Sequence, residues 1–349
     1  MLELVKSFCL SALGGFLLSL IDAPLPWMLG PVIVTAYRGY RQRKRIACPL
    51  WVREIAQLPL GYAMGRSFTA ETALLILQAL PFMLLAAALT VGAGLASAWQ
   101  MKKHSDIDLT SCLLGCVHGG FSQMVLLADE MPWADLTAVT ILQTARMLSA
   151  VAVIPFLTIH ALADADVQAA VAAAPLPPAE WPTVGLFALL AVMGMIVAKL
   201  LHIPAASLIG PILATGAYLI AAGGTAPAVP RFWLSIAQIG IGTYIGAGID
   251  AARLHDYRDY WGGILEGIVI VLGASMLTAL GICQLTGVGI TTAFLGCAPG
   301  GITEMGVTAL AVGANSAMMT AYQMARLLFI MLAYPLIVRR IVAWKHNPL

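Results

Sequence analysis

The sequence predicts an all-α polytopic membrane protein made of two homologous repeats, each with about five spanning helices and one broken or re-entrant glycine-rich segment. Three observations predict this fold class: an apolar composition, long stretches without charge, and motifs that recur at a constant spacing. Of the 349 residues, 60% are hydrophobic and 10% are charged, and the mean hydropathy is +0.89. A soluble domain carries roughly 25% charged residues, so we expect the chain to lie in a membrane.

Three stretches, residues 72–101, 203–230 and 267–303, contain no Asp, Glu, Lys or Arg. Each is longer than the roughly 18 apolar residues that indicate a spanning helix. A lone segment in lipid must satisfy its backbone N–H and C=O groups internally, and an α-helix does so. We therefore expect these stretches to be helical.

Two decapeptides, GCVHGGFSQM and GCAPGGITEM, begin 181 positions apart, at residues 115 and 296. Three further pairs of similar segments keep the same order at a shift of 180 or 181: 25–36 with 204–216, 55–65 with 236–246, and 143–155 with 323–335. A constant shift over four pairs indicates an internal duplication. The predicted domains are a first membrane repeat (1–160), an Ala/Pro-rich linker (161–182) and a second membrane repeat (183–349).

Local signals set the expected helices of each repeat in chain order. The turn residues Asp22, Ala23 and Pro24 separate two apolar runs, which predicts a helical hairpin. A shorter helix, a long uncharged helix, the decapeptide region and a closing helix follow. The first repeat is expected to contain segments 7–22, 26–38, 51–66, 74–99, 109–128 and 136–159. The second is expected to contain 184–201, 204–222, 233–249, 262–285, 290–312 and 317–338.

The Lys and Arg distribution favours an inverted arrangement of the repeats. With a cytoplasmic N-terminus and both decapeptides re-entrant, 15 Lys and Arg residues are cytoplasmic and 2, Arg66 and Arg231, are outside. If both decapeptides instead span the membrane, the repeats are parallel and the split becomes 13 to 4. Cytoplasmic loops carry an excess of positive residues. The inverted arrangement, with both termini cytoplasmic, therefore fits better.

The paired glycines Gly119-Gly120 and Gly300-Gly301 predict a break in each decapeptide, because glycine weakens a helix and permits positive φ. Close helix packing is the alternative explanation. Non-helical backbone is tolerated at membrane depth only beside protein or a wet cavity. Interrupted segments at matching places in two halves indicate a transporter's binding site. We therefore expect the two decapeptides to build one site near the bilayer midplane.

Two arginines, Arg146 and Arg326, lie in the middle of the closing helices, in the matched segments QTAR and QMAR. An arginine at that depth costs at least about 2.5 kcal/mol on insertion scales, so each must face a partner. They could contact an anionic substrate or a site carboxylate; they could also form a structural ion pair or bind the carbonyls of the re-entrant segment. Gln143 and Gln323 lie one helical turn earlier on nearly the same face and share these alternatives.

Glu304 in the second decapeptide corresponds to the neutral Gln123 of the first. A carboxyl in a low-dielectric site can carry a proton or bind a cation, which coupling to an H⁺ or Na⁺ gradient requires; a permanent salt bridge to Arg146 or Arg326 is the alternative. Ser122 and Thr303 are matched hydroxyls that could bind Na⁺ or a solute, or cap a helix. His118 could carry a proton, but its counterpart is Pro299.

The predicted substrate- and ion-binding residues are Gly119, Gly120, Ser122, Gln123, Gln143, Arg146, Gly300, Gly301, Thr303, Glu304, Gln323 and Arg326. We expect no cofactor, no metal site and no catalytic residues. The six cysteines include no CxxC pair and are expected to be small buried hydrophobic residues. The net charge of +2 gives no reason to expect a nucleic-acid partner. Without a Walker A motif, transport driven by ATP is not expected from this chain alone.

The Gly-Pro hairpins, the GCxxGG segments and the QxAR helices together resemble the AbrB family of bacterial membrane proteins, over nearly the whole chain. The resemblance implies a bacterial inner-membrane location and carries two labels, transcriptional regulator and ammonia monooxygenase. A monooxygenase needs clustered metal ligands, whereas the six histidines here are scattered. A DNA-binding regulator needs a module outside the membrane, and the longest basic loop, Arg38 to Arg53, has no room for one.

These residues predict a secondary transporter of a small polar or anionic solute that works by alternating access, with an H⁺ or Na⁺ coupling ion. The alternative is a membrane sensor that affects gene expression through a partner protein and depends on the basic loop. A membrane enzyme is the third class, and the sequence contains no constellation for it. The expected partners are a small-molecule solute, the coupling ion and the lipid bilayer; a homo-oligomer is compatible with the sequence.

Overall fold

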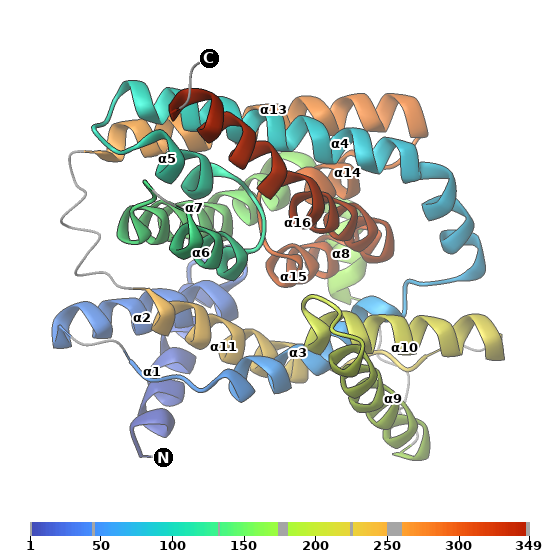
Figure 1. The fold of residues 1–349 in the computed structure, drawn as a ribbon. Helices are drawn as coiled ribbons and strands as arrows, with labels where there is room; N and C mark the ends of the chain where they lie inside the picture. Colours follow the sequence, from blue (N-terminus) through green and yellow to red (C-terminus); the bar gives the residue numbers. More distant parts are fainter. Residues whose placement is uncertain are drawn as a thin grey trace. The chain divides into compact units, whose positions relative to one another are not determined.

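The computed structural model describes residues 2–43, 46–131, 133–173, 181–223, 226–249 and 260–346, and within these ranges all regular structure is helical (Figure 1). The first helices are α1 (Leu2–Ser19), α2 (Pro26–Gln42), α3 (Leu50–Gly65), α4 (Ala70–Lys103), α5 (Leu109–Cys116), α6 (Phe121–Glu130) and α7 (Leu136–Leu157). A π-helical turn (Thr158–Leu162) and α8 (Ala165–Ala173) follow. The remaining helices are α9 (Trp181–Leu200), α10 (Ala206–Ala222), α11 (Arg231–Gly248), α13 (Trp261–Thr286), α14 (Ile290–Cys297), α15 (Ile302–Val312) and α16 (Ser316–His346).

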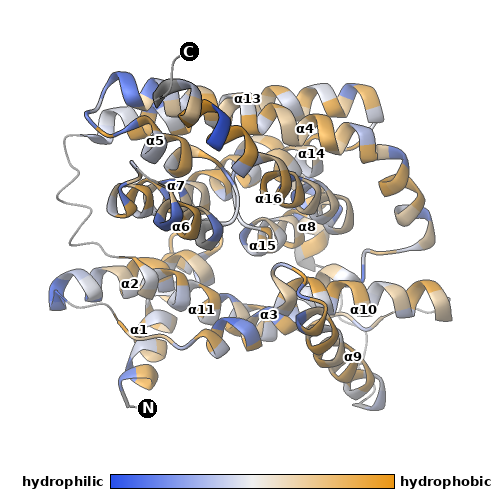
Figure 2. Cartoon of the chain, viewed as in Figure 1, coloured by the Kyte–Doolittle hydropathy of each residue, from blue (hydrophilic) through white to orange (hydrophobic). Residues whose placement is uncertain are grey.

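Five of the described helices are long and apolar enough to cross a membrane: α4, α7 with its π-helical turn, α9, α13 and α16. Figure 2 shows hydrophobic residues along most of the length of α9 and α13. Leu277 of α13 is 71% exposed and Leu332 of α16 is 73% exposed. Large apolar side chains that are exposed along a span face lipid tails rather than water. The chain is therefore an all-α, multi-pass membrane protein, as the sequence predicts.

The helices follow the predicted order, and the structure adds one element. The predicted linker, 161–182, contains α8, and residues 174–180 of the linker lie outside the described residues. Four of the charges in the Lys and Arg count, Lys44, Arg45, Arg253 and Arg258, also lie outside them. The repeat boundaries, the number of spans in each repeat and their inverted orientation stay predictions.

The chain divides into two compact units, and neither matches one predicted repeat. Unit 1 comprises the described parts of 1–77, 155–252 and 303–318, and unit 2 those of 78–154, 253–302 and 319–349. Unit 1 therefore contains α1 to α3 together with α8 to α11 and most of α15. Unit 2 contains most of α4, all of α5 and α6, and most of α7, with α13, α14 and most of α16. Each unit draws helices from both predicted repeats.

Unit 1 contains two helical hairpins, α1 with α2 and α9 with α10. The first turns through Asp22 and Leu25 at φ values of 49° and 46°, and the second through His202 and Ala205 at 54° and 52°. Non-glycine residues adopt positive φ infrequently, so the same pair of rare conformations at matching positions is a specific similarity between the hairpins. The predicted turn after 7–22 is confirmed at Asp22.

Glycines pack the helices of unit 1 closely against one another. Gly61 and Gly65 of α3 lie against α10: an added Cβ would lie 2.6 Å from the Leu208 carbonyl oxygen and 2.8 Å from that of Ile212, respectively. In α11, Gly246 lies against α2 in the same way, with the Val32 carbonyl oxygen 2.6 Å from the position of an added Cβ. Small residues four apart let helix backbones approach closely in membranes. These contacts join helices that are far apart in the sequence.

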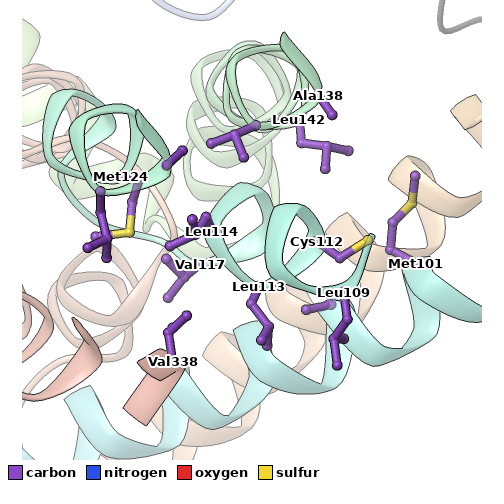
Figure 3. Close-up of a cluster of buried hydrophobic side chains, with 14 of the residues drawn as sticks. Met101, Leu109, Cys112, Leu113, Leu114, Val117, Met124, Ala138, Leu142 and Val338 are labelled. Atoms are coloured by element: carbon purple, nitrogen blue, oxygen red, sulfur yellow. The ribbon is translucent and has the colours of Figure 1, made fainter. Parts of the chain in front are cut away.

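Unit 2 has its own apolar core, formed by side chains of α4, α5, α6, α7, α13 and α16 (Figure 3). Leu113, Leu114 and Val117 around α5 have no exposed surface, and Val338 of α16 packs in the same cluster. The hydroxyl of Tyr334 donates a hydrogen bond of 2.6 Å to the Leu113 carbonyl oxygen. The short helix α5, which has only 8 residues, thus packs in a core that longer helices help to form.

Candidate solute and ion site

Both decapeptides are broken helices, as the paired glycines predict. Helix α5 ends at Cys116 and α6 begins at Phe121; helix α14 ends at Cys297 and α15 begins at Ile302. The four pieces have 8, 10, 8 and 11 residues, or roughly 12–17 Å of helix at 1.5 Å per residue. None alone crosses a hydrocarbon core of about 30 Å.

The glycines serve different purposes at the first break. Gly120 has a φ of 62°, a left-handed conformation that a side chain would strain. Gly119 lies against Ile330 of α16, which leaves no room for a Cβ. The Gln123 side chain folds back over Gly120. Ser122 lies in α6, but its side chain is outside the described part of the structure.

At the second break, the Gly300 N–H donates to the Ala298 carbonyl oxygen at 2.8 Å, and Gly301 is exposed.

A break frees backbone carbonyls that the helix would otherwise use, and a glutamine from the closing helix binds them in each case. Gln143 Nε2 donates to the carbonyl oxygens of Leu114 (2.7 Å) and Val117 (3.2 Å). Gln323 Nε2 donates to those of Leu295 (2.7 Å) and Ala298 (3.3 Å). The two predicted counterparts thus make the same pair of contacts. Both sets lie within unit 2.

Arg326 binds the second break with both of its terminal nitrogens. Nη1 donates to the carbonyl oxygens of Cys297 (3.2 Å) and Ala298 (2.5 Å), and Nη2 donates to that of Gly300 (2.9 Å) and to the Gln323 side-chain oxygen. Of the alternatives open from the sequence, the geometry matches an arginine that binds the carbonyls of the broken segment. The side chain is 6% exposed, and the contacts satisfy donors that would be costly unpaired in the membrane.

Arg146 connects the first closing helix to the second broken segment. Its Nη2 donates to Gln143 Oε1 at 2.6 Å and its Nη1 donates to the Pro299 carbonyl oxygen at 3.3 Å, all within unit 2. Among the described carboxylates of unit 2, Asp108 caps α5, Asp135 caps α7, Glu266 binds the Gln100 side chain, and Asp106, Asp129 and Glu130 are exposed. Unit 2 therefore contains two largely buried guanidinium groups whose hydrogen-bond partners include backbone carbonyl oxygens and glutamine side chains.

Thr303 and Glu304 belong to unit 1, where a chain of two polar side chains leads to Thr303. Gln57 Nε2 of α3 donates to Thr303 Oγ1 at 2.8 Å, and Ser207 Oγ of α10 donates to Gln57 Oε1 at 2.7 Å. Thr303 is 6% exposed, Glu304 9% and Gln57 1%. Gln57 was not among the predicted site residues. The available signal was an amide side chain in the apolar segment 55–65, which is costly in a membrane without a partner.

His118 lies at the first break, where it is 3% exposed and its Nδ1 has no hydrogen-bond partner. Among the described residues, no three His, Cys, Asp or Glu side chains come together as a set of metal ligands. The six cysteines are free thiols. Cys112 and Cys297 are buried as expected, whereas Cys9 is exposed and the other three are partly exposed, so the expectation that all six are buried was wrong. The thiols therefore remain available as chemical reporters.

Comparisons with known proteins agree on one family. The family described as "Transition state regulatory protein AbrB" matches residues 27–342. The chain is 27% identical to YhjN of Bacillus subtilis (strain 168) over 93% of this chain and 90% of that protein. It is also 27% identical, over 93% of this chain and 92% of the relative, to a protein of Escherichia coli (strain K12) that is named AbrB and described as a candidate regulator.

Proposed function

The chain belongs to the AbrB family, and from that premise we propose that it is a secondary transporter of a small polar or anionic solute in the bacterial inner membrane. Two broken helices whose freed carbonyls are held by buried Gln and Arg side chains carry this proposal. Interrupted helices at membrane depth are typical of transporter binding sites. At such a break, free backbone N–H and C=O groups face protein or a wet cavity and not the lipid. The proposal assigns the protein no enzymatic step.

Charge favours an anionic substrate over a cation. Arg146 and Arg326 place two positive charges in unit 2, and their hydrogen-bond partners there include carbonyl oxygens and glutamine amides. Neutral oxygens satisfy the guanidinium N–H groups but leave the net charge of the arginine in place. An anion that enters such an environment is stabilised more strongly than it would be in water, because the effective dielectric is lower. In this proposal the arginines attract the anion mainly through their charge, since their N–H groups already donate hydrogen bonds to backbone carbonyl oxygens and glutamine side chains.

We propose alternating access between the two compact units, because these units, and not the predicted repeats, are the bodies that pack internally. One of the places where the chain passes from one unit to the other lies between Ile302 and Thr303, next to the second break. Loop or element-terminal residues can absorb the backbone rotation that such a motion needs. Glu304, at the start of α15, is the proposed site for the coupling H⁺ or Na⁺. The proposed partners are a solute, that ion and the bilayer. A homo-oligomer is the assembly to test, and both termini are proposed to be cytoplasmic.

The test is solute movement in proteoliposomes that contain the purified full-length protein. Small organic and inorganic anions are offered with an imposed H⁺ or Na⁺ gradient, and a neutral sugar of similar size serves as the solute control. We expect gradient-driven accumulation of at least one anion. Glu304→Gln should abolish accumulation driven by the gradient but retain exchange of solute for solute, because the coupling group is lost while the anion site stays.

Arg339→Ala is the matched control, because the Arg339 side chain is 63% exposed and forms only a 3.9 Å ion pair with Glu130. It should transport as the wild type does. Liposomes with wild-type protein that move no anion faster than empty liposomes would contradict the proposal. Unchanged gradient coupling in Glu304→Gln would contradict the role of that residue alone.

A regulator is the second candidate function, since the family description and the name of the Escherichia coli relative use that word. In that case the protein would affect gene expression through a partner, and the basic residues between Arg38, near the end of α2, and Arg53, near the start of α3, would contact that partner. Deletion of positive charges in this stretch would then abolish the transcriptional effect, while Glu304→Gln would leave it unchanged. Transport predicts the reverse pattern.

A further inference from the structure

Unit 2 contains a small cavity beside the first broken segment. It has a volume of about 20 Å³, which exceeds the roughly 10–15 Å³ that one water molecule requires. Four helices and the break contribute to its walls: Ser97 from α4, Cys116 and His118 from the end of α5 and the break, Arg146 from α7 and Gly267 from α13 are among the lining residues.

The polar groups at this cavity are buried and not fully paired. Ser97 and His118 are each 3% exposed, and the Nδ1 atom of His118 lacks a hydrogen-bond partner. Most buried polar atoms in proteins are hydrogen-bonded, so an exception indicates an unseen ligand, a water molecule or a functional role. A small polar group bound in this water-sized cavity would give the unpaired ring nitrogen a hydrogen-bond partner.

The charge around the cavity selects the sign of the ligand. Arg146 lines the cavity, and Arg326 carries a second buried positive charge in the same unit. Of the described acidic residues of unit 2, Glu266 of α13 is next to the lining residue Gly267, but its carboxylate is exposed and lies on Gln100 and His104. The others cap helices or are exposed. A cation would be repelled by both guanidiniums. A small anion would be attracted by them and would accept hydrogen bonds from the Ser97 hydroxyl and a His118 ring N–H.

Glycines on α13 shape this cavity by bringing α13 close to α4, and Figure 1 shows the two helices side by side. A Cβ at Gly267 would collide with the Ser97 hydroxyl oxygen, and one at Gly263 would lie 2.9 Å from the Met101 sulfur.

The second break differs at the positions that match two lining residues of the cavity, His118 and Leu142. Their predicted counterparts are Pro299 and Tyr322. Proline offers no ring N–H, and the Tyr322 side chain lies against Gly296. The imidazole donor is thus specific to the first break.

We propose that the cavity lined by Ser97, Cys116, His118 and Arg146 binds a small monovalent anion. This inference rests on the proposed function and deepens it, because it names small monoanions as the substrate class and places their binding site within unit 2 at the first break. The ligand is either a free inorganic anion or the carboxylate end of a small organic acid. Both present one negative charge and oxygen or halide acceptors to the same donors.

The test uses Cys116 as a reporter, because its thiol lines the cavity. A full-length variant keeps Cys116 and replaces the other five cysteines with serine or alanine; the matched variant keeps only Cys297, the predicted counterpart at the second break. Each is treated with a small neutral methanethiosulfonate, and the modified fraction is followed by intact mass spectrometry. Sodium bromide, sodium formate and sodium gluconate are compared at equal ionic strength.

We expect bromide or formate to slow the modification of Cys116 in a saturable way, gluconate to have no such effect, and Cys297 to react equally in all three salts. Protection by formate alone identifies a carboxylate site, and protection by bromide as well identifies a general site for small anions. Ser97→Ala should raise the half-protecting concentration by roughly tenfold or more, because a hydrogen bond to a charged group contributes that much.

Equal reaction of Cys116 in all three salts would overturn the proposal, and so would equal protection of both cysteines. If Cys116 is unreactive in every salt, the unfolding temperature is the readout. Bromide or formate must then raise it relative to gluconate in the wild type but not in Ser97→Ala, or the proposal fails. If anions protect Cys116 but the protein transports no solute, the anion site is supported and the transporter proposal is contradicted. If the protein transports anions but they do not protect Cys116, the transporter proposal is supported and the anion site is contradicted.

Discussion

Arg326 is the residue whose removal should most directly test how the second broken helix is held. Arg326→Ala removes the donors that bind the carbonyl oxygens of Cys297, Ala298 and Gly300. The Ala298 oxygen keeps other donors, from Gln323 Nε2 at 3.3 Å and the Gly300 N–H at 2.8 Å. The variant therefore leaves two carbonyl oxygens, those of Cys297 and Gly300, without the arginine donor on which they rely.

The expected loss follows from these two oxygens. A buried acceptor that loses its partner costs about 1–3 kcal/mol, so two cost roughly 2–6 kcal/mol. The variant also no longer has to bury a guanidinium, which offsets part of the loss. We expect a net destabilisation of about 2 kcal/mol, at the lower end of this range, and a fall in the unfolding temperature of about 4–8 °C, by the scaling for domains of 150–250 residues. Arg326→Lys should fall between the two, because an ammonium keeps the charge but cannot fork across several carbonyls.

The assay is thermal unfolding in detergent, followed by a maleimide dye that fluoresces when it reacts with a thiol. Cys112, which has no exposed surface in the core of unit 2, becomes reactive only when that unit opens. Arg339→Ala is the control, since exposed ion pairs contribute about 0–1 kcal/mol. If Arg326→Ala and Arg339→Ala unfold at the same temperature, Arg326 does not hold the break, and its burial must serve something other than the backbone.

Three further outcomes are expected. Gly65→Ala should destabilise the protein by about 1–3 kcal/mol, because the new Cβ would lie 2.8 Å from the Ile212 carbonyl oxygen. Gly273→Ala is the control: a Cβ there would have nothing within 4 Å, so the variant should be neutral or slightly stabilised in the same unfolding assay. Equal effects of the two substitutions would contradict the close packing of α3 and α10. Gln57→Leu should cost about 1–3 kcal/mol by removing its bonds to the Thr303 and Ser207 hydroxyls, and an unfolding temperature equal to that of the wild type would show that this polar chain is not stabilising. Single cysteines placed in the 161–182 linker should react with an impermeant thiol reagent from the periplasmic side only, and labelling from the cytoplasm would rule out the inverted arrangement.

The relation between sequence and structure differs between the helices and the site. Helix positions were predictable because a spanning segment needs a long apolar run and its ends need polar or turn residues, as at Asp22 and at the charged end of α4, Lys102 and Lys103. The breaks at Gly120 and after Cys297 were predictable as well, since paired glycines lower helicity wherever they stand. These are local properties, and they do not depend on which helices become neighbours.

Tertiary structure alone decided what the buried polar groups bind. From the sequence, Arg326 could equally face a carboxylate, a solute or a carbonyl, and only the packing of α16 against the second break placed three carbonyl oxygens within its reach. Gln57 and Thr303 are 246 positions apart and met because α15 folds against α3. The cavity at His118 likewise exists because glycines let α13 approach α4.

The amino-acid order by itself determined the membrane class, the helices and the places where two of them break. Those features follow from how each short stretch partitions between water and lipid and from the backbone freedom of single residues. Only the packed structure decided that each compact unit combines helices from both halves of the chain, and that two buried arginines bind backbone oxygens. Long-range contacts of this kind depend on shape and distance between many helices at once, which no single stretch of sequence specifies.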